Sequence, residues 1–176
     1  METIVLIGPI GVGKSTQAKL LAERLGMPRC SYDEVKGKYW EALGLSREKA
    51  HSIEKEQGTY AMISYMNDFK SKTVCSIIED YSGYIIDFGG GAQTFDEPHQ
   101  VEMVQQAFEP IKNIFLLLPT PDLETNIKSL PGLKENYPIN AYLIMHPTNK
   151  IFAKKTVYTL GKTSEDITNE IISLLE

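Results

Sequence analysis

A stretch of nine residues near the start of the chain combines glycines, a lysine and two hydroxyl side chains. This sequence, GPIGVGKST at 8–16, fits the pattern G-x-x-x-x-G-K-[ST] from Gly8 to Ser15, which is typical of loops that hold the phosphates of a nucleotide. Gly11 and Gly13 let the backbone curl so that successive N–H groups point inward, and the start of a helix adds its positive end. The spacing therefore predicts a polyphosphate site.

The residues of this loop have separate expected roles. Lys14 would reach the β- and γ-phosphates as a point charge, Ser15 would offer its hydroxyl to Mg²⁺, and Thr16 would add contacts to the α-phosphate. Val12 lies among the curled residues and is expected to contribute its backbone to the nucleotide site. A chance glycine-rich turn is the alternative, but the motif follows an apolar run and precedes a helical pattern, as a phosphate-binding loop requires. ATP and Mg²⁺ are therefore the expected cofactors.

A second group of glycines, Gly89, Gly90 and Gly91, follows an apolar run that ends in Asp87. Glycines at the edge of a sheet allow a molecule to approach the backbone, although a tight turn between a strand and a helix has the same composition. Asp87 is placed either to hold a magnesium-bound water or to accept backbone hydrogen bonds from the phosphate loop. Asp33 is a further carboxylate, of a residue type that commonly forms the N-cap of a helix, here one beginning near residue 34.

The elements that would position these residues follow from apolar runs that alternate with helical periodicity. Strands are expected at 3–7, 29–32, 84–87, 113–118 and 156–160, and helices at 16–25, 46–80, 100–108 and 164–175. This alternation predicts an α/β protein, with a parallel sheet of about five strands between two layers of helices. Ligands of such sheets bind beyond the carboxyl ends of the strands.

Length, charge and cysteine content limit the possible functions. With 176 residues, the chain is expected to form a single domain over 1–176. A net charge of -5 provides no basic field, so neither nucleic acid nor a membrane is an expected partner. Two cysteines without metal-ligand spacing, and no long apolar window, indicate a cytoplasmic protein with reduced thiols and a buried, inert Cys30. No sequence feature indicates an oligomeric state.

The order of four motifs resembles that of shikimate kinase and its relatives among the small P-loop kinases. These motifs are LIGPIGVGKST at 6–16, YDEV at 32–35, GGGA at 89–92 and TVYTLGKTSED at 156–166. The resemblance extends over nearly the whole chain, but only the first motif is specific by itself. It implies a three-layer P-loop kinase fold that transfers a phosphoryl group from ATP to a hydroxyl of a small molecule.

The resemblance also assigns roles to residues outside the phosphate loop. By this resemblance, Asp33 would orient the acceptor hydroxyl or take its proton. Tyr60 and the glycines at 89–91 would also contact the acceptor, with 34–80 as a helical region on the acceptor side. Residues 128–155 would form a lid over the phosphates. The loop of Gly161, Lys162 and Thr163 would pack beside the adenine ring, although capping of the last helix also explains Thr163.

The chain departs from the family in its arginines, which in shikimate kinases hold the anionic substrate and the transferred phosphoryl group. Only Arg24, Arg29 and Arg47 are present, while Tyr60 and Met145 stand where the family has arginines. Shikimate is therefore not the expected acceptor. A nucleoside or nucleotide acceptor remains open, favoured if aromatic residues and Asp87 line a base-sized slot, as does a nucleotide-binding module with weak or no kinase activity.

Several other residues are assigned by default to structural positions. Core packing is the favoured explanation of Trp40 and of an aromatic and methionine stripe at helical spacing, although each could line the acceptor site instead. The stripe consists of Tyr60, Met62, Tyr65, Met66 and Phe69. His146 is expected to be a surface imidazole, with a contact to phosphate as the alternative.

Overall fold

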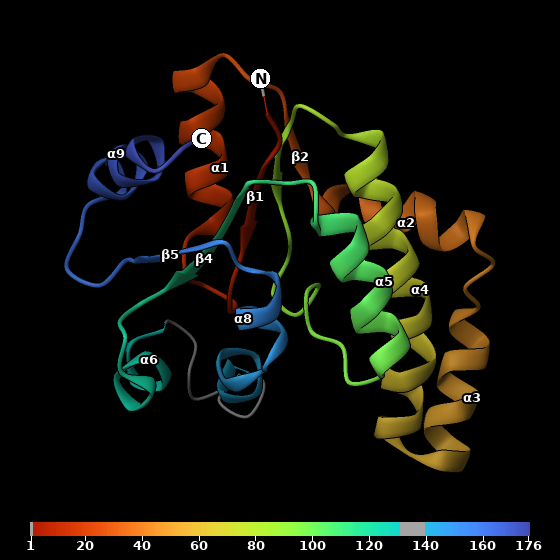
Figure 1. Ribbon diagram of the computed structural model, residues 1–176. Helices are drawn as coiled ribbons and strands as arrows, with labels where there is room; N and C mark the ends of the chain where they lie inside the picture. The colour runs from red at the N-terminus through yellow and green to blue at the C-terminus, as the bar shows by residue number, and fades with distance from the viewer. Residues whose placement is uncertain (1, 131–139) are drawn as a thin grey trace.

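A five-stranded parallel sheet lies at the centre of the computed structural model, which describes residues 2–130 and 140–176 (Figure 1). Neighbouring strands all run parallel, in the order β2-β3-β1-β4-β5. The strands are β1 (Ile4–Ile7), β2 (Arg29–Ser31), β3 (Ile85–Asp87), β4 (Asn113–Leu118) and β5 (Lys155–Tyr158). The predicted α/β fold is confirmed.

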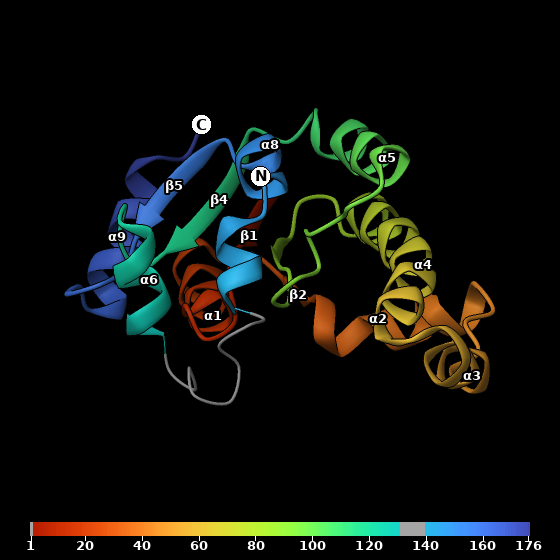
Figure 2. The ribbon, with the colours of Figure 1, turned by 90° about the horizontal axis from the view of Figure 1, so that it is seen from below.

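Helices cover both faces of the sheet, and Figure 2 shows the loop that follows β3 between the two groups. One face carries α1 (Lys14–Leu25) and α9 (Ser164–Ser173). The other carries α2 (Tyr32–Ala42), α4 (Thr59–Asp80), α5 (Pro98–Phe108) and α8 (Thr148–Phe152), with α3 (Arg47–Gln57) packed on α4. A short α6 (Leu123–Ser129) follows β4, and residues 140–145 are also helical.

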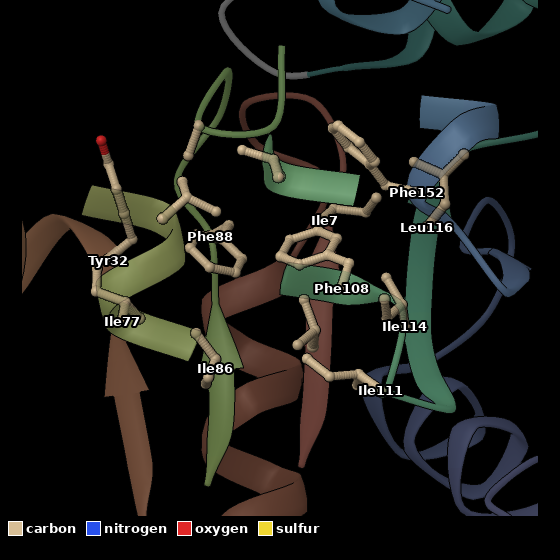
Figure 3. Packing of buried hydrophobic residues seen from close by; sticks show 14 of the residues in the cluster. Ile7, Tyr32, Ile77, Ile86, Phe88, Phe108, Ile111, Ile114, Leu116 and Phe152 are labelled. Atoms are coloured by element: carbon tan, nitrogen blue, oxygen red, sulfur yellow. The ribbon is translucent and has the colours of Figure 1, made fainter. Parts of the chain in front are cut away.

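The strands divide their side chains between two hydrophobic clusters, because successive residues of a strand point to opposite faces. In β1, Val5 and Ile7 join the cluster under α4 and α5, whereas Ile4 and Leu6 join the cluster under α1 and α9. Figure 3 shows the first cluster, in which the rings of Phe108 and Phe152 pack edge to face with each other. Strands buried on both faces explain the nearly continuous apolar runs of the sequence.

Helix ends follow the sequence signals in most places. Gly26 ends α1 in the left-handed conformation, and Thr163 and Asp166 form a complete capping box at the start of α9. The helical stretches expected from about 46 to 80 are α3 and α4, which Gly58 separates with a φ of 90°. The alternative role of Asp33 as an N-cap is wrong, since α2 begins at Tyr32.

Two further expectations concern the thiols and the membrane. Cys30 is buried, and burial raises the pKa of its thiol to about 11, which is consistent with an inert side chain. Over 2–130 and 140–176, no helix combines the length and apolarity that crossing a bilayer requires.

Candidate active site

The phosphate loop connects β1 to α1 at the carboxyl end of the central strand. Gly8, Gly11 and Gly13 have φ values of 145°, 80° and 101°, which residues with a side chain rarely adopt. A Cβ on Gly8 would also lie 2.4 Å from the carbonyl oxygen of Leu117 in β4. The curled backbone predicted for this loop is therefore present, and Gly8 is fixed by its closeness to the neighbouring strand.

Lys14 is folded back onto its own loop. Its Nζ donates hydrogen bonds of 2.9 and 2.7 Å to the carbonyl oxygens of Gly8 and Pro9, and the side chain is buried. Burial lowers the pKa of Lys14 to about 8, against the opposing effects of the Asp87 and Asp33 carboxylates. Two backbone carbonyls of the loop therefore hold the ammonium at the predicted polyphosphate site.

Asp87 accepts hydrogen bonds from three side chains at the end of β3. Ser15 Oγ lies 3.2 Å and Ser31 Oγ 3.0 Å from Oδ1, while Arg29 donates to Oδ2 at 3.0 Å. Burial raises the pKa of this carboxyl, against those hydrogen bonds and the charge of Arg29. Its partners are thus side chains, not the backbone N–H groups of the phosphate loop that the sequence left as an alternative.

The pair of Ser15 and Asp87 fits the Mg²⁺ that the sequence implies. Both present oxygen atoms, which Mg²⁺ prefers, and they meet beside the phosphate loop. In the described parts of the chain, no three His, Cys, Asp or Glu side chains gather as a metal site. A site with few protein ligands suits Mg²⁺, because it usually retains several waters and takes further ligands from nucleotide phosphates.

Asp33 lies against the first glycine of the triplet. A Cβ on Gly89 would be 2.4 Å from Asp33 Oδ2 and 2.9 Å from its Cγ, so only glycine leaves room for the carboxylate. The other partner of Asp33 is Lys36, one turn along α2. The structure thus brings together Asp33 and the glycine triplet, as the resemblance implied.

The other two glycines have different neighbours. A Cβ on Gly90 would lie 2.3 Å from Cγ1 of Ile10 in the phosphate loop, and one on Gly91 would lie 3.2 Å from Leu143 Cδ2. Gly91 also has a φ of 85°. Gly90 therefore joins the phosphate loop to the acceptor side, and only Gly89 packs against Asp33.

A cavity of about 570 Å³ opens beside the glycine triplet. Four aromatic side chains (Tyr32, Trp40, Tyr60 and Tyr142) and four charged ones (Asp33, Lys36, Lys70 and Asp96) line it, together with Ile63, Gly90, Gly91, Ala92, Thr94 and Leu143. Core packing was the wrong preference for Trp40 and for Tyr60, which is 72% exposed. A second hollow of about 300 Å³, between α5 and α8, contains none of the predicted site residues.

Lys70 is a cavity residue that the sequence interpretation missed. Its Nζ donates hydrogen bonds of 3.0 and 2.6 Å to the carbonyl oxygens of Gly91 and Thr94, and burial lowers its pKa to about 8. A signal was present, because Lys70 shares one face of α4 with the buried Asn67, Val74 and Ile77. A lysine on the inward face of a helix indicates a buried partner for the ammonium.

A polar group around Asp96 also contributes to the cavity, through Asp96 and Tyr142. The Tyr142 hydroxyl lies 3.1 and 3.0 Å from the two carboxylate oxygens of Asp96, and His146 Nε2 lies 3.3 Å from Oδ1. His146 is buried, with Nδ1 2.6 Å from the Thr148 hydroxyl, so the expectation of a surface imidazole was wrong. Because 46 and 50 residues separate Asp96 from these two partners, no local pattern pointed to the group.

The remaining predicted residues lie at the periphery. Val12, within the phosphate loop, has a buried side chain, whereas Thr16 is exposed at the start of α1. Lys162 pairs with Glu170, and the hydroxyl of Thr163 is engaged in the capping box of α9. The predicted lid at 128–155 includes residues 131–139, which lie outside the described residues, and its later part packs inward through Ile144 and Phe152.

Comparison with known proteins confirms the resemblance to shikimate kinases. A shikimate kinase of Dehalococcoides mccartyi is 36% identical over 107 residues, which are 59% of this chain and 52% of that protein. The chain thus spans about half the length of this curated relative. No protein-family model matches the chain.

Solved structures share the fold at lower identity. A shikimate kinase from Acinetobacter baumannii in complex with shikimate gives a TM-score of 0.61 at 20% identity, covering 99% of this chain and 92% of that one. A gluconokinase from Sinorhizobium meliloti gives 0.58 at 13% identity, covering 98% and 90% of the two chains. The fold is therefore that of the small P-loop kinases.

Proposed function

We propose that the protein transfers the γ-phosphoryl group of ATP to a hydroxyl of a small molecule, in the presence of Mg²⁺. The observation that carries this proposal is the junction between the two halves of the site. Gly90 packs against Ile10 of the phosphate loop and also lines the cavity in which Asp33 stands. A nucleotide on the loop and an acceptor in the cavity would therefore meet at this junction.

The polar residues on the two sides of this junction each have a role in such a transfer. On binding of ATP, the Lys14 ammonium would exchange the Gly8 and Pro9 carbonyls for phosphate oxygens and stabilise the charge of the transferred group. Mg²⁺, held through Ser15 and Asp87, would neutralise charge on the β- and γ-phosphates. Asp33 would orient the acceptor hydroxyl. The acceptor oxygen bonds to the γ-phosphorus, the bridging oxygen leaves with ADP, and the hydroxyl proton passes to Asp33.

The nucleotide base is assigned to the loop of Gly161, Lys162 and Thr163. This assignment follows the order of motifs shared with the shikimate kinases and the position of the loop between β5 and α9. The lid assigned to residues 128–155 belongs to the same proposal, as does a single kinase domain over the whole chain. Resemblance supports these assignments, while contacts within the site support Lys14, Asp33 and Gly89.

Two alternatives each have a supporting observation. The aromatic lining of the cavity favours a nucleoside acceptor, although Asp87 does not line it. The arginines favour a nucleotide-binding module, because Arg24 pairs with Glu165 and Arg29 with Asp87. None of the arginines lines the cavity.

Replacement of Lys14 tests the proposal against its matched neighbour Lys19, which is exposed on the same helix. Lys14→Ala is expected to weaken ATP binding by at least about tenfold and to abolish acceptor-dependent ADP release, because it removes a charge-assisted contact to phosphate. Lys19→Ala should change neither. ATP affinity is measured by calorimetric titration, ADP release by a coupled assay and stability by melting curves, each for the parent and the two variants. A folded Lys14→Ala protein with unchanged ATP affinity would remove the basis of the assignment, whereas ATP binding without any acceptor effect would select the nucleotide-binding module.

A further inference from the structure

We propose that the acceptor is an uncharged molecule in which a planar ring accompanies the reacting hydroxyl, an inference that rests on the proposed function. The cavity supports this class of molecule in three ways: exposed aromatic faces, buried polar atoms without partners, and cations that are already engaged. None of these three features uses arginine, the residue that would bind an anionic acceptor.

The aromatic faces are available to a ligand. Tyr60 is 72% and Tyr142 43% exposed, so both rings offer apolar surface to the cavity instead of packing in the core. Both residues line the same cavity, and the Tyr142 ring also packs edge to face with His146. Rings held in this way stack favourably on a planar partner.

Two buried polar atoms on the same cavity have no hydrogen-bond partner in the described structure. They are the hydroxyl of Tyr32, a residue only 4% exposed, and Nε1 of Trp40. Figure 3 shows the Tyr32 hydroxyl pointing away from the hydrophobic side chains beside it. The indole of Trp40 opposes the rise in the Tyr32 pKa that burial and Asp33 cause, as a weak hydrogen-bond partner would, but neither polar atom has a partner at full hydrogen-bond geometry in the described residues. Burying such groups without partners is costly, so a ligand with polar ring atoms or hydroxyls would supply what is missing.

The cations of the cavity leave little charge for an anionic acceptor. The ammonium of Lys36 pairs with Asp33 and lies 5.5 and 5.4 Å from the ring centroids of Tyr32 and Trp40. Lys70 donates two hydrogen bonds to backbone carbonyls. The described charged groups that line the cavity are these two lysines and the carboxylates of Asp33 and Asp96, so their formal charges cancel. A carboxylate would enter without an unengaged cation, whereas an uncharged molecule needs none.

Trp40 reports on this cavity directly, because it is the single tryptophan of the chain. The intact protein is titrated with two uncharged ring compounds, adenosine and uridine, each of which joins a planar base to a sugar with hydroxyls. It is also titrated with shikimate and gluconate, which carry hydroxyls and a carboxylate. Trp40 emission and calorimetry would record binding without ATP. At least one ring compound should bind saturably and promote ADP release when ATP is added. The carboxylates should show no binding at tenfold higher concentrations.

Tyr32→Phe separates ligand binding from a structural role. Loss of the hydroxyl should weaken binding of the ring compound by about tenfold, and the melting temperature should stay the same or rise because an unpartnered buried hydroxyl is gone. Tyr81→Phe is the matched control, since the hydroxyl of Tyr81 accepts from Lys38 and does not line the cavity. It should leave ligand affinity unchanged.

Three results would overturn the inference. They are saturable binding of shikimate or gluconate in preference to the ring compounds, failure of both ring compounds to bind, and a Tyr32→Phe protein that melts earlier but binds as the parent does. Transfer from ATP to a carboxylate acceptor would leave the proposed kinase function standing and defeat this inference alone. Unchanged ATP affinity in Lys14→Ala would instead defeat the kinase function, whatever Trp40 reports.

Discussion

The phosphate loop and the proposed acceptor cavity are built from different parts of the chain. The loop is built from the consecutive residues Gly8 to Ser15 and works mainly through backbone curvature and one lysine. The cavity gathers side chains from α2, α4, the loop after β3 and residues 140–145. A site made by a contiguous backbone can serve any acceptor, whereas a site made by distant side chains can differ between proteins that share the fold.

Gly89→Ala is the prediction with the largest expected effect, because Gly89 packs directly against Asp33 and precedes Gly90, where the two regions meet. The new Cβ would lie 2.4 Å from the Asp33 carboxylate, at the end of a side chain that can turn away. The protein should fold, but displacement of the proposed base should lower kcat by about a hundredfold or more. ATP affinity should stay within about a factor of two of the parent value.

Gly37→Ala is the matched control for this change. A Cβ on Gly37, within α2, meets no atom within 4 Å. Alanine there should stabilise the protein by about 0.5–1 kcal/mol without affecting kcat. Steady-state kinetics and melting curves compare the two variants. Parent-like kcat in a folded Gly89→Ala protein would show that Asp33 does not act on the acceptor.

The pH dependence of ATP binding tests the phosphate loop by itself. The pKa of Lys14 is lowered to about 8 in the folded protein, chiefly by burial, so the side chain is fully charged only below that pH. Phosphate stabilises the ammonium, and the bound state therefore holds its proton more firmly. ATP affinity should be greatest below pH 8 and fall above it, by up to about tenfold per pH unit.

The stability of the free protein should change in the opposite direction. Between about pH 8 and the ordinary lysine pKa of 10.5, the unfolded chain binds more protons at Lys14 than the folded chain. Stability from this group therefore rises with pH in that window, and Lys70 contributes with the same sign. Calorimetry and denaturant titration from pH 7 to 10 measure both trends. An affinity profile that persists in Lys14→Ala would mean that another group titrates at the nucleotide.

Lys70→Met tests how the acceptor side is held, with a smaller expected effect. Loss of the ammonium removes both hydrogen bonds to the loop after β3, at Gly91 and Thr94. We expect stability to fall by about 1–3 kcal/mol and the acceptor KM to rise by about tenfold. ATP affinity should not change. Lys72→Met, at an exposed position of the same helix, is the control, and equal effects of the two changes would contradict a specific role for Lys70.

The contrast between the regions also explains what the sequence could predict. Lys14 and Ser15 could be predicted because the phosphate-loop motif consists of consecutive residues. The sheet could be predicted from apolar runs such as 113–118. Asp33 and Gly89 were linked only by resemblance, because they are 56 positions apart in the sequence and only the fold brings them together. His146 was misplaced because its contact with Asp96 joins residues 50 positions apart, which no periodicity connects.

Thr163 provides the smallest expected effect and separates the nucleotide site from simple helix capping. Its hydroxyl accepts from the backbone N–H of Asp166 and pairs with that carboxylate, and its own N–H donates to Asp166 Oδ2 at 3.1 Å. Thr163→Ala should therefore cost about 1 kcal/mol of stability, whereas Thr163→Ser retains the cap. ATP affinity should be the same in both, because the capping box already engages the hydroxyl and leaves only the backbone for the nucleotide. Weaker ATP binding by Thr163→Ala at temperatures far below its melting point, with parent-like binding by Thr163→Ser, would show instead that the hydroxyl contacts the nucleotide.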